Sequence, residues 1–270
     1  MMAHSQPIRA TVQYLAIVDG GDAVYHASQA GGDAASHDGQ YDMREVLIHN
    51  GRGQRFDLDK AGFMLVPHIS AMTDFHDDAA LAAIYEAEAK QLVAGITGAR
   101  RVEIFDHTRR AASDAIRRQQ VMREPSSVIH NDYTPWSAER RLRDVLPDEA
   151  ETLLAGRFAI INVWRSIGGR VETSPLAFCD SQTLAAGDLV EVTRQAKDRV
   201  GQIQMARFNP AHEWVYFPDM EMDEAVLIKT YDSATDGRNR FTIHTAFTDP
   251  AAPPDAAPRQ SIETRCFVFF

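Results

Sequence analysis

The pattern of apolar and polar positions changes along the chain. From residue 158 onward, short apolar runs recur at short intervals, and turn residues separate nearly all of them. Many short strands with regular punctuation are typical of a β-sandwich or barrel rather than of alternating strands and helices. The expected strands cover residues 158–163, 176–179, 189–192, 202–207, 214–217, 225–230, 241–247 and 266–270.

The first hundred residues mix the two periods. Between residues 74 and 97 the apolar positions follow helical spacing, with Thr73 or Asp74 as the N-cap and Gly98 as the end. The Gly- and Asp-rich segment 31–39 predicts a mobile loop. Strands are expected at residues 11–16, 45–49, 63–66 and 101–106.

The segment between these two regions is more polar. Residues 108–123 predict a loosely ordered stretch, and two helix starts within 137–154, separated by Pro147, predict two short helices.

Composition excludes several classes of protein. A net charge of −10 over 270 residues disfavours nucleic acid as a partner. The sequence contains no run of 18 apolar residues, so no membrane span is expected, and residues 1–7 lack the apolar core of a signal peptide. Two cysteines are too few for a disulfide framework. We therefore expect a cytoplasmic protein that binds neither membranes nor nucleic acid.

A metal site is the strongest chemical hypothesis. His130 and Asp132 are separated by one residue at the end of an apolar run, so both side chains point to the same side of an extended segment. The best third ligand is His244, in a later expected strand. Two imidazoles and one carboxylate leave open coordination positions, as non-haem Fe(II) oxygenases require. Farther on, Arg259 and Ser261 could clamp a small dicarboxylate.

Other polar residues have plainer interpretations. His107 is the main competitor as a ligand, but a hydrogen-bonded histidine near a strand end is the more ordinary case. Cys179 precedes an aspartate with no histidine nearby, which favours a buried core position over a nucleophile. For Glu263 and Arg265 we expect an ion pair on the outside of the sheet. Motifs for phosphate loops, dinucleotide binding and a serine nucleophile are absent from the sequence.

Four residues are candidates for contact with a substrate. Tyr133 and Trp136 follow the proposed ligands directly, and Trp164 and Arg165 lie on the next expected strand. Aromatic residues there can line a pocket, although ordinary core packing explains each equally well. Asn162 and Arg165 are three positions apart and face opposite sides, so only one can point into a barrel.

Helices before many strands, with a metal pair at the junction, favour a mainly β fold with flanking helices. We expect one domain over residues 1–270: an N-terminal α/β elaboration (1–100) and a double-stranded β-helix, or jelly roll, as the core (101–270).

Several segments resemble the CmcJ/AsaB-like hydroxylase/desaturase family, which also contains the fungal gibberellin desaturases. The resemblance covers roughly residues 100–270, and the first hundred residues match loosely. The matching segments are Val128–Thr134, Asn162–Arg165, Pro175–Asp180, Trp214–Pro218, Leu227–Ser233, His244–Phe247 and Pro258–Arg265.

The resemblance implies an Fe(II)/2-oxoglutarate-dependent oxygenase of secondary metabolism. It implies His130, Asp132 and His244 as iron ligands, and Arg259 and Ser261 as the residues that hold the distal carboxylate of 2-oxoglutarate. The expected partners are a small organic substrate and O₂, with a homodimer as a possibility. Two alternatives stay open at this point: a non-catalytic jelly-roll binding protein, and a cupin-type metal hydrolase or isomerase with the same ligands.

Overall fold

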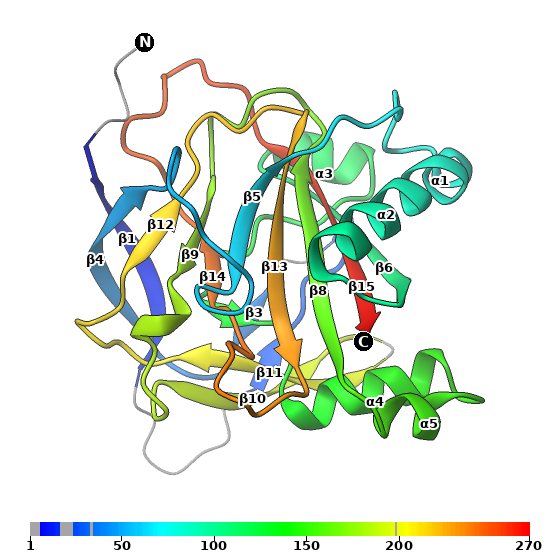
Figure 1. The fold of residues 1–270 in the computed structure, drawn as a ribbon. Coiled ribbons are helices and arrows are strands. Elements are labelled where there is room, and N and C mark those ends of the chain that lie inside the picture. Colours follow the sequence, from blue (N-terminus) through cyan, green and yellow to red (C-terminus); the bar gives the residue numbers. More distant parts are fainter. Residues whose placement is uncertain (1–5, 17–23, 33–34, 198) are drawn as a thin grey trace.

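The strands form two β-sheets that pack against each other through a shared core. The computed structural model describes residues 6–16, 24–32, 35–197 and 199–270 (Figure 1). Trp164 and Ile228 of one sheet pack with Phe178 and Val215 of the other in a single hydrophobic cluster. This arrangement confirms the jelly roll with flanking helices.

The larger sheet holds ten strands among the described residues and supplies one wall of the barrel. Most strands that lie side by side in this sheet are far apart in the sequence. In order across the sheet, the strands are β1 (Ile8–Leu15), β4 (Tyr41–Asn50), β12 (Trp214–Tyr216), β9 (Leu176–Cys179), β14 (His244–Ala246), β7 (His130–Asn131), β11 (Val200–Ala206), β10 (Leu189–Gln195), β2 (Val24–His26) and β3 (Ser36–His37).

The smaller sheet holds five strands among the described residues. Its three central strands are buried almost throughout, because the barrel interior covers one face and helices and loops cover the other. Such two-sided burial explains the unbroken apolar runs within them, such as residues 158–161 and 225–228. In order, the strands are β5 (Phe63–Pro67), β13 (Glu224–Asp232), β8 (Phe158–Ser166), β15 (Gln260–Phe269) and β6 (Arg101–Ala111).

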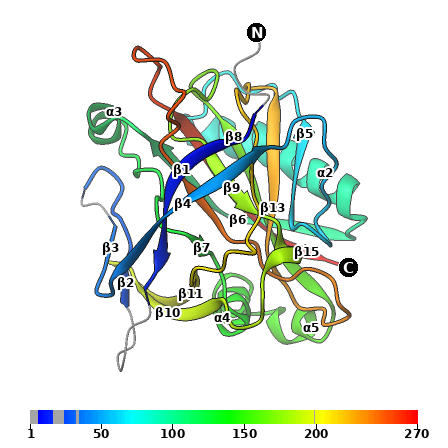
Figure 2. The same cartoon turned by 90° about the vertical axis from the view of Figure 1, so that its left-hand side faces the viewer.

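Helices cover the outside of the barrel. Helix α2 (Glu86–Thr97) packs on β6 and β15, and helix α4 (Pro135–Val145) lies against β11 at the other end of the fold (Figures 1 and 2). None of the helices in the described ranges is long and apolar enough to cross a membrane. The helices are α1 (Asp78–Ala80), a π-helical segment (Leu81–Tyr85), α2 (Glu86–Thr97), α3 (Asp114–Gln119), α4 (Pro135–Val145), α5 (Ala150–Leu154) and a 3₁₀ turn (Ser181–Thr183).

The structure corrects the sequence prediction in three places. The helix is capped by Asp77, whose carboxylate accepts from two backbone N–H groups, and not by Thr73 or Asp74. Residues 108–123 are ordered: β6 runs on to Ala111, and α3 follows with Ser113 as its N-cap. The predicted loop 31–39 contains β3, which pairs with β2. Residues 33 and 34 of that loop, and residues 1–5 at the N-terminus, lie outside the described part.

Candidate active site

The two proposed histidine ligands lie directly opposite each other on neighbouring strands. His244 of β14 is the antiparallel partner of His130 of β7, and their ring centroids are 4.6 Å apart. In each ring, Nδ1 lies 2.8–3.0 Å from a backbone carbonyl oxygen two residues earlier. Because a carbonyl can only accept, Nδ1 carries the proton and Nε2 is left with a lone pair for a metal.

Asp132 completes a three-residue cluster. Its Oδ1 lies 3.5 Å from Nε2 of His130, and one potential ligand atom from each of His130, Asp132 and His244 lies within 4.8 Å of the others. Ligands about 2.0–2.2 Å from a common ion must lie about 3–4 Å apart, so small side-chain shifts bring all three onto one metal. His107 lies outside this cluster, and its ring contacts Thr264 and Glu86 instead.

The second carboxylate oxygen of Asp132 is held by the smaller sheet. It accepts hydrogen bonds from Asn162 Nδ2 and from Arg265 Nε, each at 2.9 Å. Arg265 also donates to Asp106 at 2.6 Å and to Glu263 at 2.8 Å. The expectation that Glu263 and Arg265 pair on the outside of the sheet is therefore wrong: they do pair, but inside the barrel.

Electrostatics keep the cluster in the protonation state that a metal needs. Burial alone would raise the pKa of Asp132, but the Arg265 guanidinium and the nearby imidazoles hold it well below its usual range. Burial, and then the charge of His130, lower the pKa of His244, so this ring is neutral at neutral pH. Metal ligands must be deprotonated, and both of these residues meet that condition.

Asn131, between the two ligands, ties their strand to its neighbours. Its fully buried side chain donates to the carbonyl of Tyr133 and to Gln204 of β11, and it accepts from the backbone N–H of Thr242. Thr242 lies two residues before His244. One amide therefore sets the position of both ligand-bearing segments.

The proposed co-substrate residues are buried and unsatisfied. Arg259 is 2% exposed, and its Nη1 donates to the carbonyl of Ser174, while its guanidinium lies 5.5 Å from the ring of Trp164. Within the described part of the protein, Arg259 Nε and Nη2 and Ser261 Oγ have no hydrogen-bond partner. Burial, and then the charge of Arg110, lower the pKa of Arg259 to about 9.

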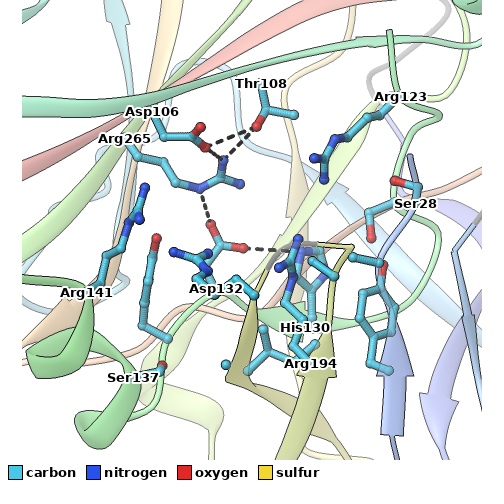
Figure 3. Close-up of a pocket in the computed structure, with 18 of the residues that line it drawn as sticks. Ser28, Asp106, Thr108, Arg123, His130, Asp132, Ser137, Arg141, Arg194 and Arg265 are labelled. Atoms are coloured by element: carbon cyan, nitrogen blue, oxygen red, sulfur yellow. Dashed lines mark hydrogen bonds and ion pairs between the residues drawn. The ribbon is translucent and has the colours of Figure 1, made fainter. Parts of the chain in front are cut away.

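A cavity of about 610 Å³ opens next to the cluster (Figure 3). His130 and Asp132 form part of its wall, together with Arg265, Tyr133 and Trp136. This volume is in the range of sites that bind small organic molecules.

The four substrate candidates have different positions. Tyr133 and Trp136 line the cavity, and Trp136 is 51% exposed. Trp164 is 2% exposed and packs in the core between the sheets. Arg165 lies on the opposite face of β8 from Asn162, contacts His68 and does not line this cavity.

Sequence reasoning missed the role of Arg265 although a signal was present. Side chains alternate along a strand, so an inward-facing Ser261 also directs Glu263 and Arg265 inward. The cavity arginines Arg123 and Arg194 carried no such signal, because they come from a loop and from a different strand that meet only in the folded chain.

A jelly roll with two imidazoles and one carboxylate at one end of its interior is the architecture of a non-haem iron oxygenase. Comparison with known proteins agrees. The family model described as "Oxidoreductase/YMDC permease-like domain" matches residues 12–269. The chain belongs to this oxidoreductase family. Its relatives include proteins named hydroxylase/desaturase and Fe(II)/2-oxoglutarate-dependent dioxygenase.

Three relatives make the membership specific. The chain is 41% identical to the hydroxylase/desaturase asaB of Aspergillus flavus, over 85% of this chain and 82% of the relative. It is 32% identical to the hydroxylase/desaturase CTB9 of Cercospora beticola, over 93% and 83%. The solved structure of the iron and alpha-ketoglutarate-dependent endoperoxidase NvfI superposes with a TM-score of 0.86 at 28% identity, covering 98% of both chains. These similarities favour an oxygenase over a non-catalytic protein or a hydrolase.

Replacing Arg265 with Met should lower the free energy of unfolding by about 3–5 kcal/mol at pH 7, because buried carboxylates lose their partner. In the wild type, the lowered pKa of Asp132 gives stability that is present above about pH 4 and is lost as the pH falls through the folded pKa. In the variant, burial raises that pKa instead. The difference between the two metal-free proteins should therefore shrink between pH 7 and pH 4 in denaturant titrations.

Arg101→Met is the matched control. Arg101 bonds two carboxylates, Glu103 and Glu149, but its side chain is about one-third exposed. We expect this variant to lose less than about 1 kcal/mol. Equal losses in both variants, or a loss at Arg265 that does not vary with pH, would contradict the buried-network explanation.

Proposed function

We propose that the chain is an Fe(II)- and 2-oxoglutarate-dependent oxygenase in which His130, Asp132 and His244 bind the iron. The observation that carries this proposal is the convergence of the three side chains beside a cavity. The names of the relatives supply the identity of the metal and the co-substrate. We further propose that residues 1–270 form a single domain. A homodimer and a cytoplasmic location stay predictions.

The same proposal assigns Arg259 and Ser261 to the distal carboxylate of 2-oxoglutarate. The unpartnered atoms Arg259 Nε, Arg259 Nη2 and Ser261 Oγ support this assignment, since a buried donor without an acceptor is costly. A carboxylate can accept from a guanidinium through two parallel hydrogen bonds. With a pKa of about 9, Arg259 still carries its charge at neutral pH.

When bound, iron and 2-oxoglutarate would supply the oxidation of a substrate C–H bond by O₂. The residues of the protein would orient the metal ligands and the substrate, and they would exclude water from the site. The backbone carbonyls behind His130 and His244 direct both Nε2 atoms inward, and Arg265 fixes the carboxylate of Asp132. Tyr133 and Trp136 would hold a small organic molecule at the cavity wall, where it is hydroxylated or desaturated.

The proposal predicts that His244→Ala loses iron. Removing residues that only orient a ligand typically costs 10–100-fold in metal affinity, so losing a ligand should cost more than about tenfold. Turnover of 2-oxoglutarate to succinate should disappear with the metal. Metal content per folded protein and succinate formation are the measurements. His107→Ala is the control and should keep both, so iron loss in the control alone would overturn the ligand assignment.

A second prediction concerns the co-substrate. Arg259→Lys keeps the charge but loses the planar fork, so the Kd for 2-oxoglutarate should rise by about tenfold or more while iron binding stays unchanged. Calorimetric titration of the iron-loaded protein under anaerobic conditions measures both. Arg165→Lys is the control, because Arg165 lies on the face of β8 that points away from the barrel interior; this variant should leave the Kd for 2-oxoglutarate unchanged. An effect at Arg165 and none at Arg259 would reverse the assignment.

Substitution of the two tryptophans should have different effects, because Trp136 lines the cavity and Trp164 packs in the core. Trp136→Ala should lower the amount of oxidised product per succinate with little loss of stability, because Trp136 is half exposed on the cavity wall. Trp164→Ala should cost about 3–5 kcal/mol of stability, because its ring fills the core under Arg259. Coupling ratios and melting curves on both variants test this. Unchanged coupling in Trp136→Ala would remove that residue from the site.

A further inference from the structure

The cavity beside the metal cluster is far more basic than the rest of the molecule. The whole protein carries a net charge of −10, yet nine Arg or Lys residues and three Asp residues line the cavity among the residues described. The three carboxylates already have cationic partners. Asp106 and Asp132 bond Arg265, and Asp144 bonds Arg140.

Three half-buried arginines of this cavity are left without a carboxylate. Arg123 precedes β7, Arg141 belongs to α4 and Arg194 belongs to β10, and all three lie around one space in Figure 3. Across the described residues, none of the three guanidinium groups makes an ion pair or a side-chain hydrogen bond. Arg141 only lies over the ring of Phe105, at 5.2 Å, and its Nε is buried without a partner.

Neighbouring positive charges also act on Arg123 and Arg194. Burial, and then Arg110 and Arg265, lower the pKa of Arg123. Burial, and then Arg265, Arg199 and Arg123, lower the pKa of Arg194. A folded chain gains nothing from gathering unpaired like charges in a partly desolvated space. The arrangement is therefore unfavourable in the free protein and becomes favourable once an anion occupies the space.

We infer that the substrate is an organic anion whose carboxylate, phosphate or sulfate group binds between Arg123 and Arg194. This inference rests on the proposed function for the position of the iron. Arg141 would add a third positive charge, and the aromatic walls of Tyr133 and Trp136 would contact the apolar part of the molecule. The anionic group would thereby fix which carbon faces His130 and Asp132.

The test is calorimetric titration of the full chain, loaded anaerobically with Fe(II) and saturating 2-oxoglutarate, with four matched probes. These are 2-naphthoate, 2-naphthyl phosphate, 2-naphthalenesulfonate and the neutral methyl 2-naphthoate. At least one anionic probe should bind about tenfold or more tightly than the ester, and more weakly as salt shortens the screening length. The preferred anion identifies the acid group of the substrate. Equal binding of the ester and all three anions would overturn the inference.

The variant Arg123→Gln/Arg194→Gln should lose about tenfold or more in affinity for the preferred anionic probe. Its melting temperature should stay the same or rise, because repulsion is removed. The control Arg170→Gln/Arg207→Gln changes the net charge equally at exposed positions outside the cavity and should bind as the wild type does. Unchanged probe binding in the first variant would overturn the inference, and so would a lower melting temperature.

A third measurement distinguishes substrate from co-substrate. The Kd of the Arg123→Gln/Arg194→Gln variant for 2-oxoglutarate, titrated without any probe, should equal that of the wild type. A large rise in that Kd would mean that the arginines hold the co-substrate, which contradicts the inference. Probe binding requires no catalytic turnover, so absence of succinate formation would count against the proposed function and leave this result intact.

Discussion

The guanidinium of Arg265 is the point where the two sheets and the candidate metal-binding carboxylate meet. It belongs to the smaller sheet, and it bonds Asp132, which follows β7 of the larger one. It also bonds Asp106 and Glu263, so one positive charge faces three negative charges at the end of the barrel interior. These bonds hold the carboxylate of Asp132 ionised and fixed in position, which is the state that a divalent cation at the cluster requires.

Hydrogen bonds of residues next to the proposed ligands also connect the site to the surrounding strands and to helix α4. The side chain of Asn131 bonds Gln204 of β11 and the backbone N–H of Thr242, so it ties the segment that carries His130 to the segment that carries His244. Immediately after Asp132, Thr134 begins helix α4 through a reciprocal capping box with Ser137. Helix α4 in turn supplies one wall of the cavity. A shift in any of these elements would change ligand geometry and cavity shape at once.

The sequence was most informative where one local rule decides the outcome. Strand periods predicted the strands of the jelly roll, and the spacing of His130 and Asp132 placed both side chains on one side. Local rules failed where partners come from distant segments. The proximity of Trp164 to the ligands in sequence could not reveal that its ring packs in the core, while Trp136 lines the cavity. The polar composition of residues 108–123 predicts a loosely ordered chain, whereas the end of β6 is held by its pairing with β15, which composition does not encode.

The arginines of the site form two groups, one with carboxylate partners in the protein and one without them. Arg265 is satisfied by carboxylates of the protein itself, and its removal leaves those charges uncompensated. Arg123 and Arg194 have no such partners, and their mutual repulsion opposes folding. Stability explains the first group and cannot explain the second. In a protein whose overall charge is strongly negative, a cavity with a positive field attracts small anions. The same residues that weaken the empty fold thus make the cavity selective.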